Sequence, residues 1–299
     1  MLRGVVLIAL AAVSWGTTGS VTTVLVAGAG VHPWVIGAAR MWIAAALLLV
    51  ATRVMRAPLP LGRGRLGVAV VLGACMAAFQ ATYFTAVTMT GIAITALVAI
   101  CSAPVMIAAL AVLVLRERLT IRVLVSIALG VVGTALLVAN PHTVAPAAPR
   151  LALGALLALG AALSYAVYVV VAKAALARTE PLPLAAVTFT VAAILLTLPL
   201  AWTDAPVTQL ARGWPWLIYL GAVTTAAAYA LYTTGLRHVP ASVAGIVSLF
   251  EPLTATLLGA LLFGERLGPT GIAGALLLFT AVTLSLVSIG RAPSDITRV

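Results

Sequence analysis

Glu251 is the side chain of this sequence with the most distinctive chemical setting, because it lies inside a long apolar segment. That segment runs from Ala241 to Phe263. No other acidic residue of the sequence lies within a predicted apolar segment. Counted along a helix, it lies about 15 Å from the start, near the middle of a bilayer. A carboxyl at that depth is costly, which favours a function such as contact with a substrate ammonium group or binding of a proton. The alternative is a structural bond to a neighbouring helix beside a bend at Pro252, and the sequence leaves both interpretations open.

Arg40 is a basic residue in a comparable position, six residues into the apolar segment from Trp34 to Thr52. This spacing places it about 9 Å below the start of the segment. A long Arg side chain at that depth can extend back to the nearer headgroups and keep its charge hydrated, and we favour this interpretation. The alternative is an inward role, in which the guanidinium pairs with a substrate carboxylate.

Aromatic and amide side chains also lie deep within apolar segments. Trp15 lies about 16 Å along the first segment, although Trp usually prefers the membrane interface. A Trp at mid-depth is typical of a cavity wall, with plain packing as the alternative. Gln80 and Tyr83 share one face of the third segment because they are three residues apart, and Tyr165 lies on the sixth segment. With Glu251, these four side chains are the predicted substrate-binding or cavity residues.

The tyrosines differ in depth. Tyr83 counts to about 26 Å from the inner face, near the outer mouth. Tyr165 with Tyr168, and Tyr229 with Tyr232, count to the opposite mouth. This spacing predicts that some of these aromatic side chains are gates rather than contacts in one common site. Anchoring at the membrane interface is the alternative, and we favour it for Tyr168 and Tyr232.

Two prolines lie in the middle of apolar segments, at Pro104 and Pro252. Each removes a backbone hydrogen bond and is expected to kink its helix. We interpret the pair as hinges, with fixed bends that shape packing as the alternative.

Catalysis receives no support from the sequence. His32, His142 and His238 lie in loops and are too scattered to hold a metal, and no Ser, His and acid share a common depth. We therefore expect a protein that is not an enzyme and that has no metal or cofactor.

The composition requires lipid as the solvent. Of 299 residues, 64% are hydrophobic and only 8% are charged, whereas a soluble domain carries about 25% charged residues. Apolar runs of about 20 residues are long enough to cross a bilayer as helices. Ten such transmembrane helices are predicted: Gly4–Ala27, Trp34–Thr52, Leu66–Ala86, Ile94–Leu115, Ile121–Ala139, Leu151–Ala172, Pro183–Trp202, Trp214–Gly235, Ala241–Phe263 and Pro269–Ile289.

Positive charge is distributed unevenly over the predicted loops. With the N-terminus inside, the inner loops hold 13 of the 17 Lys and Arg residues, and the outer loops hold Arg150, Arg212 and Arg266. This bias predicts that both termini are cytoplasmic and that the protein spans a bacterial-type inner (plasma) membrane several times. The Arg residues form no continuous stripe, so we expect no nucleic-acid partner.

The chain contains an internal repeat at an offset of 148 residues. Pro104 followed by Glu117-Arg118-Leu119 matches Pro252 followed by Glu265-Arg266-Leu267. We predict two five-helix repeats, residues 1–140 and 150–290, and a short cytoplasmic tail, 291–299. Five is odd, so the second repeat is inverted, an arrangement that favours alternating access to a site at mid-depth. A channel or a non-transporting scaffold is the alternative.

With Ser14-Trp15-Gly16 in the first helix and Gly264-Glu265-Arg266-Leu267 in the second repeat, the sequence resembles the EamA-type ten-helix members of the drug/metabolite transporter superfamily. Arg116 departs from the pattern, since the first-half turn of the family usually has Gly there. Within the superfamily the chain looks most like YddG-type exporters of aromatic and other neutral amino acids. This resemblance implies a secondary exporter of amino acids, with a carrier for another metabolite or drug as the alternative.

The scarcity of buried charge agrees with a neutral or zwitterionic cargo, because exchange of a cation for a proton needs an acidic residue and the segments offer only Glu251. The expected partners are the lipid bilayer and a small-molecule substrate. Small residues such as Gly271 and Gly274 allow close helix packing within the bundle or between subunits, so a monomer and a homodimer both stay open.

Overall fold

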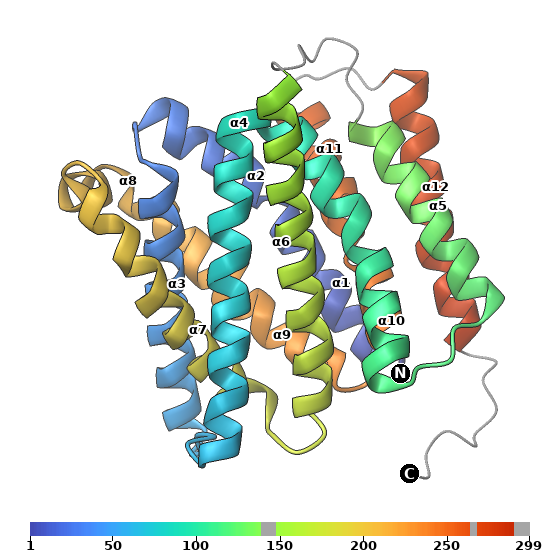
Figure 1. The fold of residues 1–299 in the computed structure, drawn as a ribbon, viewed down its shortest axis with the longest axis horizontal. Coiled ribbons are helices and arrows are strands. Elements are labelled where there is room, and N and C mark those ends of the chain that lie inside the picture. The colour runs from blue at the N-terminus through green and yellow to red at the C-terminus, as the bar shows by residue number, and fades with distance from the viewer. Residues whose placement is uncertain (139–147, 264–267, 290–299) are drawn as a thin grey trace.

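The structure is a computed structural model that describes residues 1–138, 148–263 and 268–289, and its regular elements are all helical (Figure 1). Up to residue 138 these are α1 (Leu2–Gly16), α2 (Thr18–Thr23), the π-helical turn η1 (Val24–Gly28), α3 (Pro33–Val54), α4 (Arg63–Leu115) and α5 (Ile121–Val138). From residue 148 they are α6 (Ala148–Ala175), α7 (Pro181–Thr197), the 3₁₀ turn η2 (Leu198–Trp202), α8 (Pro206–Gly221), the π-helical segment η3 (Ala222–Ala227), α9 (Ala228–Leu236), α10 (Ala241–Val247), α11 (Phe250–Phe263) and α12 (Pro269–Ile289).

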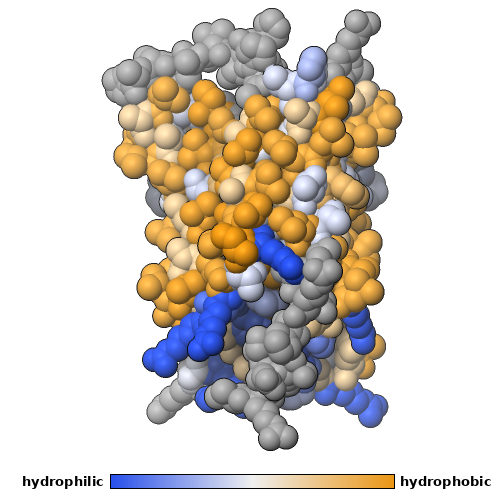
Figure 2. Space-filling view, turned by 90° about the vertical axis from the view of Figure 1, so that its right-hand side faces the viewer, coloured by the Kyte–Doolittle hydropathy of each residue, from blue (hydrophilic) through white to orange (hydrophobic). Residues whose placement is uncertain are grey.

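Nine helical stretches in the described ranges are long and apolar enough to cross a bilayer, and Ile121–Leu137 adds a shorter apolar helix. The long element α4 supplies two of these stretches, because Gly91 (φ 80°, ψ 166°) interrupts its helical backbone. Figure 2 shows the result on one face: apolar side chains cover most of its height, and hydrophilic ones gather toward its lower end. The prediction of an all-helical, multi-pass membrane protein is confirmed.

Some predicted features differ or lie outside the described residues. The eighth crossing begins at Pro206 rather than at Trp214, because Gln209 and Arg212 lower the hydropathy of its first turns without breaking the helix. Trp214 therefore lies inside α8 rather than at a helix end. His142, the turn Gly264-Glu265-Arg266-Leu267 and the tail 291–299 fall outside the described ranges.

Small residues let the helices approach closely. A Cβ added to Gly133 of α5 would lie 2.9 Å from the carbonyl oxygen of Gly274 in α12, and one added to Gly274 would lie 2.6 Å from that of Gly133. Gly274, which the sequence left open to either use, thus packs within the bundle. Van der Waals contact between such surfaces is the main force that joins helices in lipid.

Three crossings have irregular backbone in their middle. The first is interrupted at Thr17, between α1 and α2, and the eighth contains η3. The ninth is interrupted between α10 and α11, where Leu249 and Glu251 donate backbone hydrogen bonds three residues back rather than four. The first and eighth breaks adjoin, since Ser14 Oγ donates to the carbonyl of Val223 at 3.3 Å. The first and ninth also adjoin, since a Cβ added to Gly16 would lie 2.8 Å from the carbonyl oxygen of Glu251. Irregular backbone at membrane depth is tolerated where protein or a cavity surrounds it. This part of the bundle is therefore a candidate location for a site.

Candidate functional site

An aromatic cluster lies beside these breaks, centred on Trp15 near the end of α1. The ring of Trp15 lies 4.9 Å from that of Tyr229 and 5.2 Å from that of Tyr232, both on α9, and 6.5 Å from that of Tyr165 on α6. Trp15 is buried. The predicted cavity residues Trp15 and Tyr165 are therefore in direct contact, with α9 packed against α1.

Phe79 joins the second part of the cluster to the first. Its ring lies 5.9 Å from Tyr165 and 5.7 Å from Tyr83, so the predicted residue Tyr83 belongs to the same continuous cluster. Phe189 of α7 closes the far side, 4.7 Å from Tyr229. The structure thus connects side chains that depth counting assigned to opposite mouths.

Two tyrosines correct the sequence interpretation directly. Tyr168 and Tyr232, which we expected to anchor at the membrane interface, are 1% and 0% exposed and contact Tyr229. Counting depth along a helix cannot tell which way a side chain points. Both residues point into the bundle, where the other aromatic rings remove them from lipid.

Several buried polar atoms in and near this cluster have no hydrogen-bond partner in the protein. They include Nε1 of Trp15, Nε2 of Gln80, Oγ1 of Thr188 and the hydroxyls of Tyr165 and Tyr232. The two tyrosine hydroxyls lie close enough to interact with each other and with Ser248, but neither makes a hydrogen bond of good geometry. A buried unpaired donor costs about 1–3 kcal/mol. Three of these atoms belong to Trp15, Tyr165 and Tyr232, and the ring of Trp15 contacts those of both tyrosines. A polar guest beside these three residues would be stabilised.

The orientation of the Arg40 side chain also differs from the prediction. Its side chain is buried, and Nε donates to Oγ1 of Thr225 at 3.0 Å. The π-helical segment η3 positions that threonine, whose hydroxyl in turn donates to the carbonyl of Leu220 at 2.8 Å. The guanidinium therefore lies inside the bundle and does not extend to the headgroups.

Glu251 lies in the first turn of α11, immediately after the break in the ninth crossing. A carboxylate is favoured there by the helix dipole. The residue is partly accessible, and its carboxyl lies within electrostatic range of Arg40, Tyr83 and Tyr229 without a direct hydrogen bond or ion pair to them. Arg40 and Glu251 do not form a direct ion pair, since the one ion pair within 4 Å among the described residues joins Arg237 and Glu180. Arg40 and Glu251 thus lie in the same part of the bundle interior, and no salt bridge joins them.

The two prolines are not equivalent in the structure. Pro104 lies inside the second limb of α4, as predicted. Pro252 lies in the first turn of α11 rather than in the middle of a continuous helix, so the expectation of a simple kink is wrong there. Proline lacks the N–H that would bond to Ser248 and crowds that carbonyl, and the helix instead ends and restarts. The hinge role of both residues stays a prediction.

Sequence reasoning missed Phe79, Phe189 and Thr225. Nothing in their local pattern separates the two phenylalanines from ordinary apolar packing. The pair Thr224-Thr225, in the middle of an apolar segment, is a signal that could have found the partner of Arg40. Among the described residues no group of three or more His, Cys, Asp or Glu side chains could hold a metal ion.

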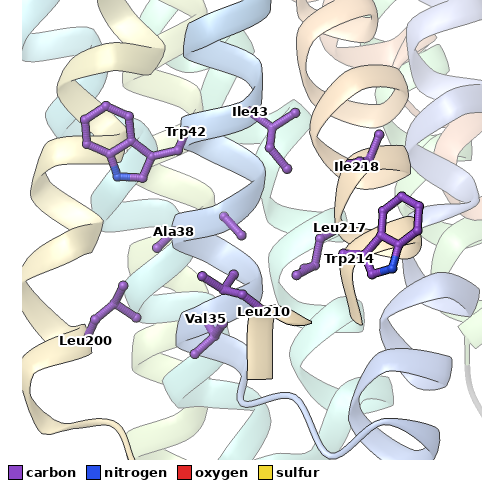
Figure 3. A pocket seen from close by; sticks show the side chains of 10 residues that line it. Val35, Ala38, Trp42, Ile43, Leu200, Leu210, Trp214, Leu217 and Ile218 are labelled. Carbon is purple, nitrogen blue, oxygen red and sulfur yellow. The ribbon is translucent and has the colours of Figure 1, made fainter. Parts of the chain in front are cut away.

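A hollow of about 380 Å³ lies apart from the cluster, between α3, η2 and α8 (Figure 3). Its lining residues are all apolar or aromatic, and Trp42 and Trp214 flank it on opposite sides in this view. These two side chains are 45% and 60% exposed. Because it offers no charged group, we assign this hollow to the lipid-facing surface rather than to a site for a polar solute.

Comparisons with known proteins agree with this architecture. Residues 2–139 and 152–287 both match the EamA-like transporter family. The chain is 37% identical over 286 residues to the uncharacterized transporter YwfM of Bacillus subtilis, covering 95% of this chain and 92% of that one. An uncharacterized transporter of Archaeoglobus fulgidus is 30% identical over 205 residues, 69% of this chain and 71% of its own. A solved crystal structure superposes with a TM-score of 0.83 at 21% identity, covering 96% of this chain and 98% of its own, which shows the shared fold.

Proposed function

The chain belongs to the EamA-like transporter family, and on this premise we propose that it is a secondary transporter that exports small neutral or zwitterionic metabolites. The expected cargo is amino acids, including aromatic ones. The expected location is the inner membrane, with both termini in the cytoplasm.

The arrangement of Arg40 and Glu251 is the observation that carries this proposal. An amino acid bears one carboxylate and one ammonium group, so it is neutral overall but needs both charges matched when it leaves water. A guanidinium binds a carboxylate through two parallel hydrogen bonds, and a carboxylate accepts from an ammonium group. This pair of groups is present in buried Arg40 and partly accessible Glu251. Both stay available to a ligand because they form no salt bridge with each other.

The aromatic cluster supports the proposal that the cargo includes amino acids with aromatic side chains. Trp15, Tyr83 and Tyr165 belong to one connected set of rings, and Tyr83 lies within electrostatic range of Glu251. Offset or edge-to-face packing of a ligand ring on such a surface stabilises it by about 0.5–1.5 kcal/mol beyond its area. The unpaired Nε1 of Trp15 and Nε2 of Gln80 are donors for a carboxylate or carbonyl oxygen.

We further propose alternating access of two inverted repeats, residues 1–140 and 150–290. The interruptions of the first, eighth and ninth crossings support this, because discontinuous helices surround the mid-depth sites of many transporters. Pro104 and Pro252 are the proposed hinges.

Glu117 provides a closing contact between the repeats. It follows α4, and its carboxylate accepts hydrogen bonds from the backbone N–H groups of Ala241 and Ser242, at 2.7 and 3.2 Å, and from the Ser242 hydroxyl at 2.8 Å. Lys173 of α6 binds the other side of the same junction, donating to the carbonyls of Leu236 and Arg237. In this conformation the α9–α10 junction is held at the basic end of the bundle.

Uptake of tritiated phenylalanine and alanine into proteoliposomes tests the proposal. We expect faster counterflow than in empty liposomes, at least a tenfold loss in Glu251→Gln, and a larger loss for phenylalanine than for alanine in Trp15→Ala. Trp202→Ala is the matched control, since Trp202 is 84% exposed and outside the cluster. Repeating the assay with an imposed pH gradient tests whether Glu251 couples transport to protons.

If neither phenylalanine nor alanine enters faster than into empty liposomes, the proposal of an amino-acid exporter is lost and a carrier for another metabolite or drug is left. Flux that neither saturates nor responds to solute on the opposite side would indicate a channel instead.

A further inference from the structure

A second hollow, of about 300 Å³, opens at the basic end of the bundle and is separate from the aromatic cluster. Three connections form it: the α3–α4 loop with Pro58 and Pro60, the α6–α7 loop, and the junction after α9. Its charged and hydroxyl-bearing lining residues are Arg65, Arg178, Thr179, Glu180 and Arg237.

The lining is electrostatically unbalanced. Arg65 lies in the first turn of α4, Arg178 in the α6–α7 loop and Arg237 at the α9–α10 junction. Glu180 is the one acidic residue of the lining. Glu180 accepts a hydrogen bond from Arg237 at 3.2 Å. Arg65 and Arg178 have no ion pair among the described residues, so the hollow carries two positive charges that no carboxylate in the described ranges contacts within 4 Å.

We propose that this hollow binds a phosphate group. Guanidinium groups bind phosphate oxygens through paired hydrogen bonds, and three of them around one concave surface fit a tetrahedral anion better than dispersed surface charge does. The hydroxyl of Thr179 adds a further donor on the same wall. Two sources share this chemistry: the headgroup of an anionic phospholipid and a soluble phosphate. Basic pockets at helix ends on the cytoplasmic side are typical sites for anionic headgroups.

A bound phosphate would tie the start of α4 to the α6–α7 loop and to the α9–α10 junction. Lys173 already holds that junction through the carbonyls of Leu236 and Arg237. The ligand would therefore stabilise the arrangement in which this end of the bundle is assembled. Phosphate binding and the stability it adds do not depend on which solute the protein transports.

The test compares the purified full chain with Arg65→Gln/Arg178→Gln and with Arg53→Gln/Arg118→Gln. Both double variants lose two positive charges from exposed residues at the same end, but only the first pair lines the hollow. Native mass spectrometry would count phosphatidylglycerol and phosphatidylcholine molecules retained by each protein. Thermal unfolding in detergent, with and without inorganic phosphate, would form the second arm. A melting curve without ligand would establish that each variant is folded.

We expect the wild type to retain phosphatidylglycerol over phosphatidylcholine, the hollow variant to bind at least tenfold more weakly, and the control variant to change less than threefold. Stabilisation by inorganic phosphate alone, lost in the same variant, would also support the site and identify the soluble source. Glu180→Gln should tighten binding, because it removes the negative charge beside Arg237. Equal losses in the two double variants would show general surface electrostatics and overturn the proposal, as would retention of neither ligand.

Discussion

Substitution of Glu117 by Gln is expected to open the basic end of the bundle. Pro240, which precedes α10, has no side chain that can cap the helix, and Glu117 takes over this role from a different part of the chain. Each hydrogen bond to a charged acceptor contributes about 1.5–3 kcal/mol. An amide of the same shape loses the charge, and its NH₂ group cannot accept from a backbone N–H.

The magnitude follows from the three bonds. Losing one bond and weakening the other two lowers the stability of the closed arrangement by about 3 kcal/mol, from the range for hydrogen bonds to charged groups. If those bonds exist only while this end is closed, the ratio of closed to open molecules falls roughly 150-fold, since 1.4 kcal/mol is about a factor of ten.

Cysteine accessibility measures this change. In a background with Cys75 and Cys101 replaced by Ala, a cysteine at Ala244 of α10 reports opening, because that position is 0% exposed in the closed bundle. Labelling by a membrane-impermeant maleimide from the basic side should accelerate strongly in Glu117→Gln. Glu180→Gln is the control, since its ion pair involves exposed side chains and such pairs contribute about 0–1 kcal/mol.

Unchanged labelling in a folded Glu117→Gln protein would refute the reasoning, because the cap would then not hold the closed arrangement. A second variant, Glu117→Asp, separates this from misfolding. It keeps the charge but shortens the reach, and we expect labelling between those of the wild type and Glu117→Gln, with an unchanged melting temperature.

Three further outcomes are expected. Arg40→Gln should abolish the preference for phenylalanine over phenethylamine, which lacks the carboxylate, in a binding titration; a preserved preference would place the carboxylate elsewhere. Gly16→Ala should lower the melting temperature by an amount equivalent to about 1–3 kcal/mol, because the added Cβ would lie 2.6 Å from Cβ of Thr254, whereas Gly19→Ala should have little effect since nothing lies within 4 Å. Pro252→Ala should slow exchange in proteoliposomes at equal or higher stability, because the restored N–H favours a continuous helix across the break; unaltered exchange would argue against a hinge.

The crossings of this protein could be predicted because they follow from the solvent. A segment that spans hydrocarbon must be long, apolar and helical, since every backbone polar group needs a partner. These requirements act on each segment separately and can be read from its residues alone. Glu251 and Trp15 could be selected for the same reason, since both residue types are unusual at mid-depth.

The directions of side chains could not be predicted in this way. Helices that are apolar on all sides give no periodic signal for the face that points inward. Arg40 was expected at the headgroups but binds Thr225, and Tyr168 and Tyr232 were expected at the interface but are buried.

Depth along each helix is therefore a property of the sequence, whereas direction around it is decided by packing. Close contacts between small residues, such as Gly133 with Gly274, fix which face meets which neighbour. The π-helical segment η3 and the break before Glu251 then bring Thr225 and the carboxyl toward Arg40. The sequence determines which residues are costly in the membrane, and the contacts between helices determine which of them share a site.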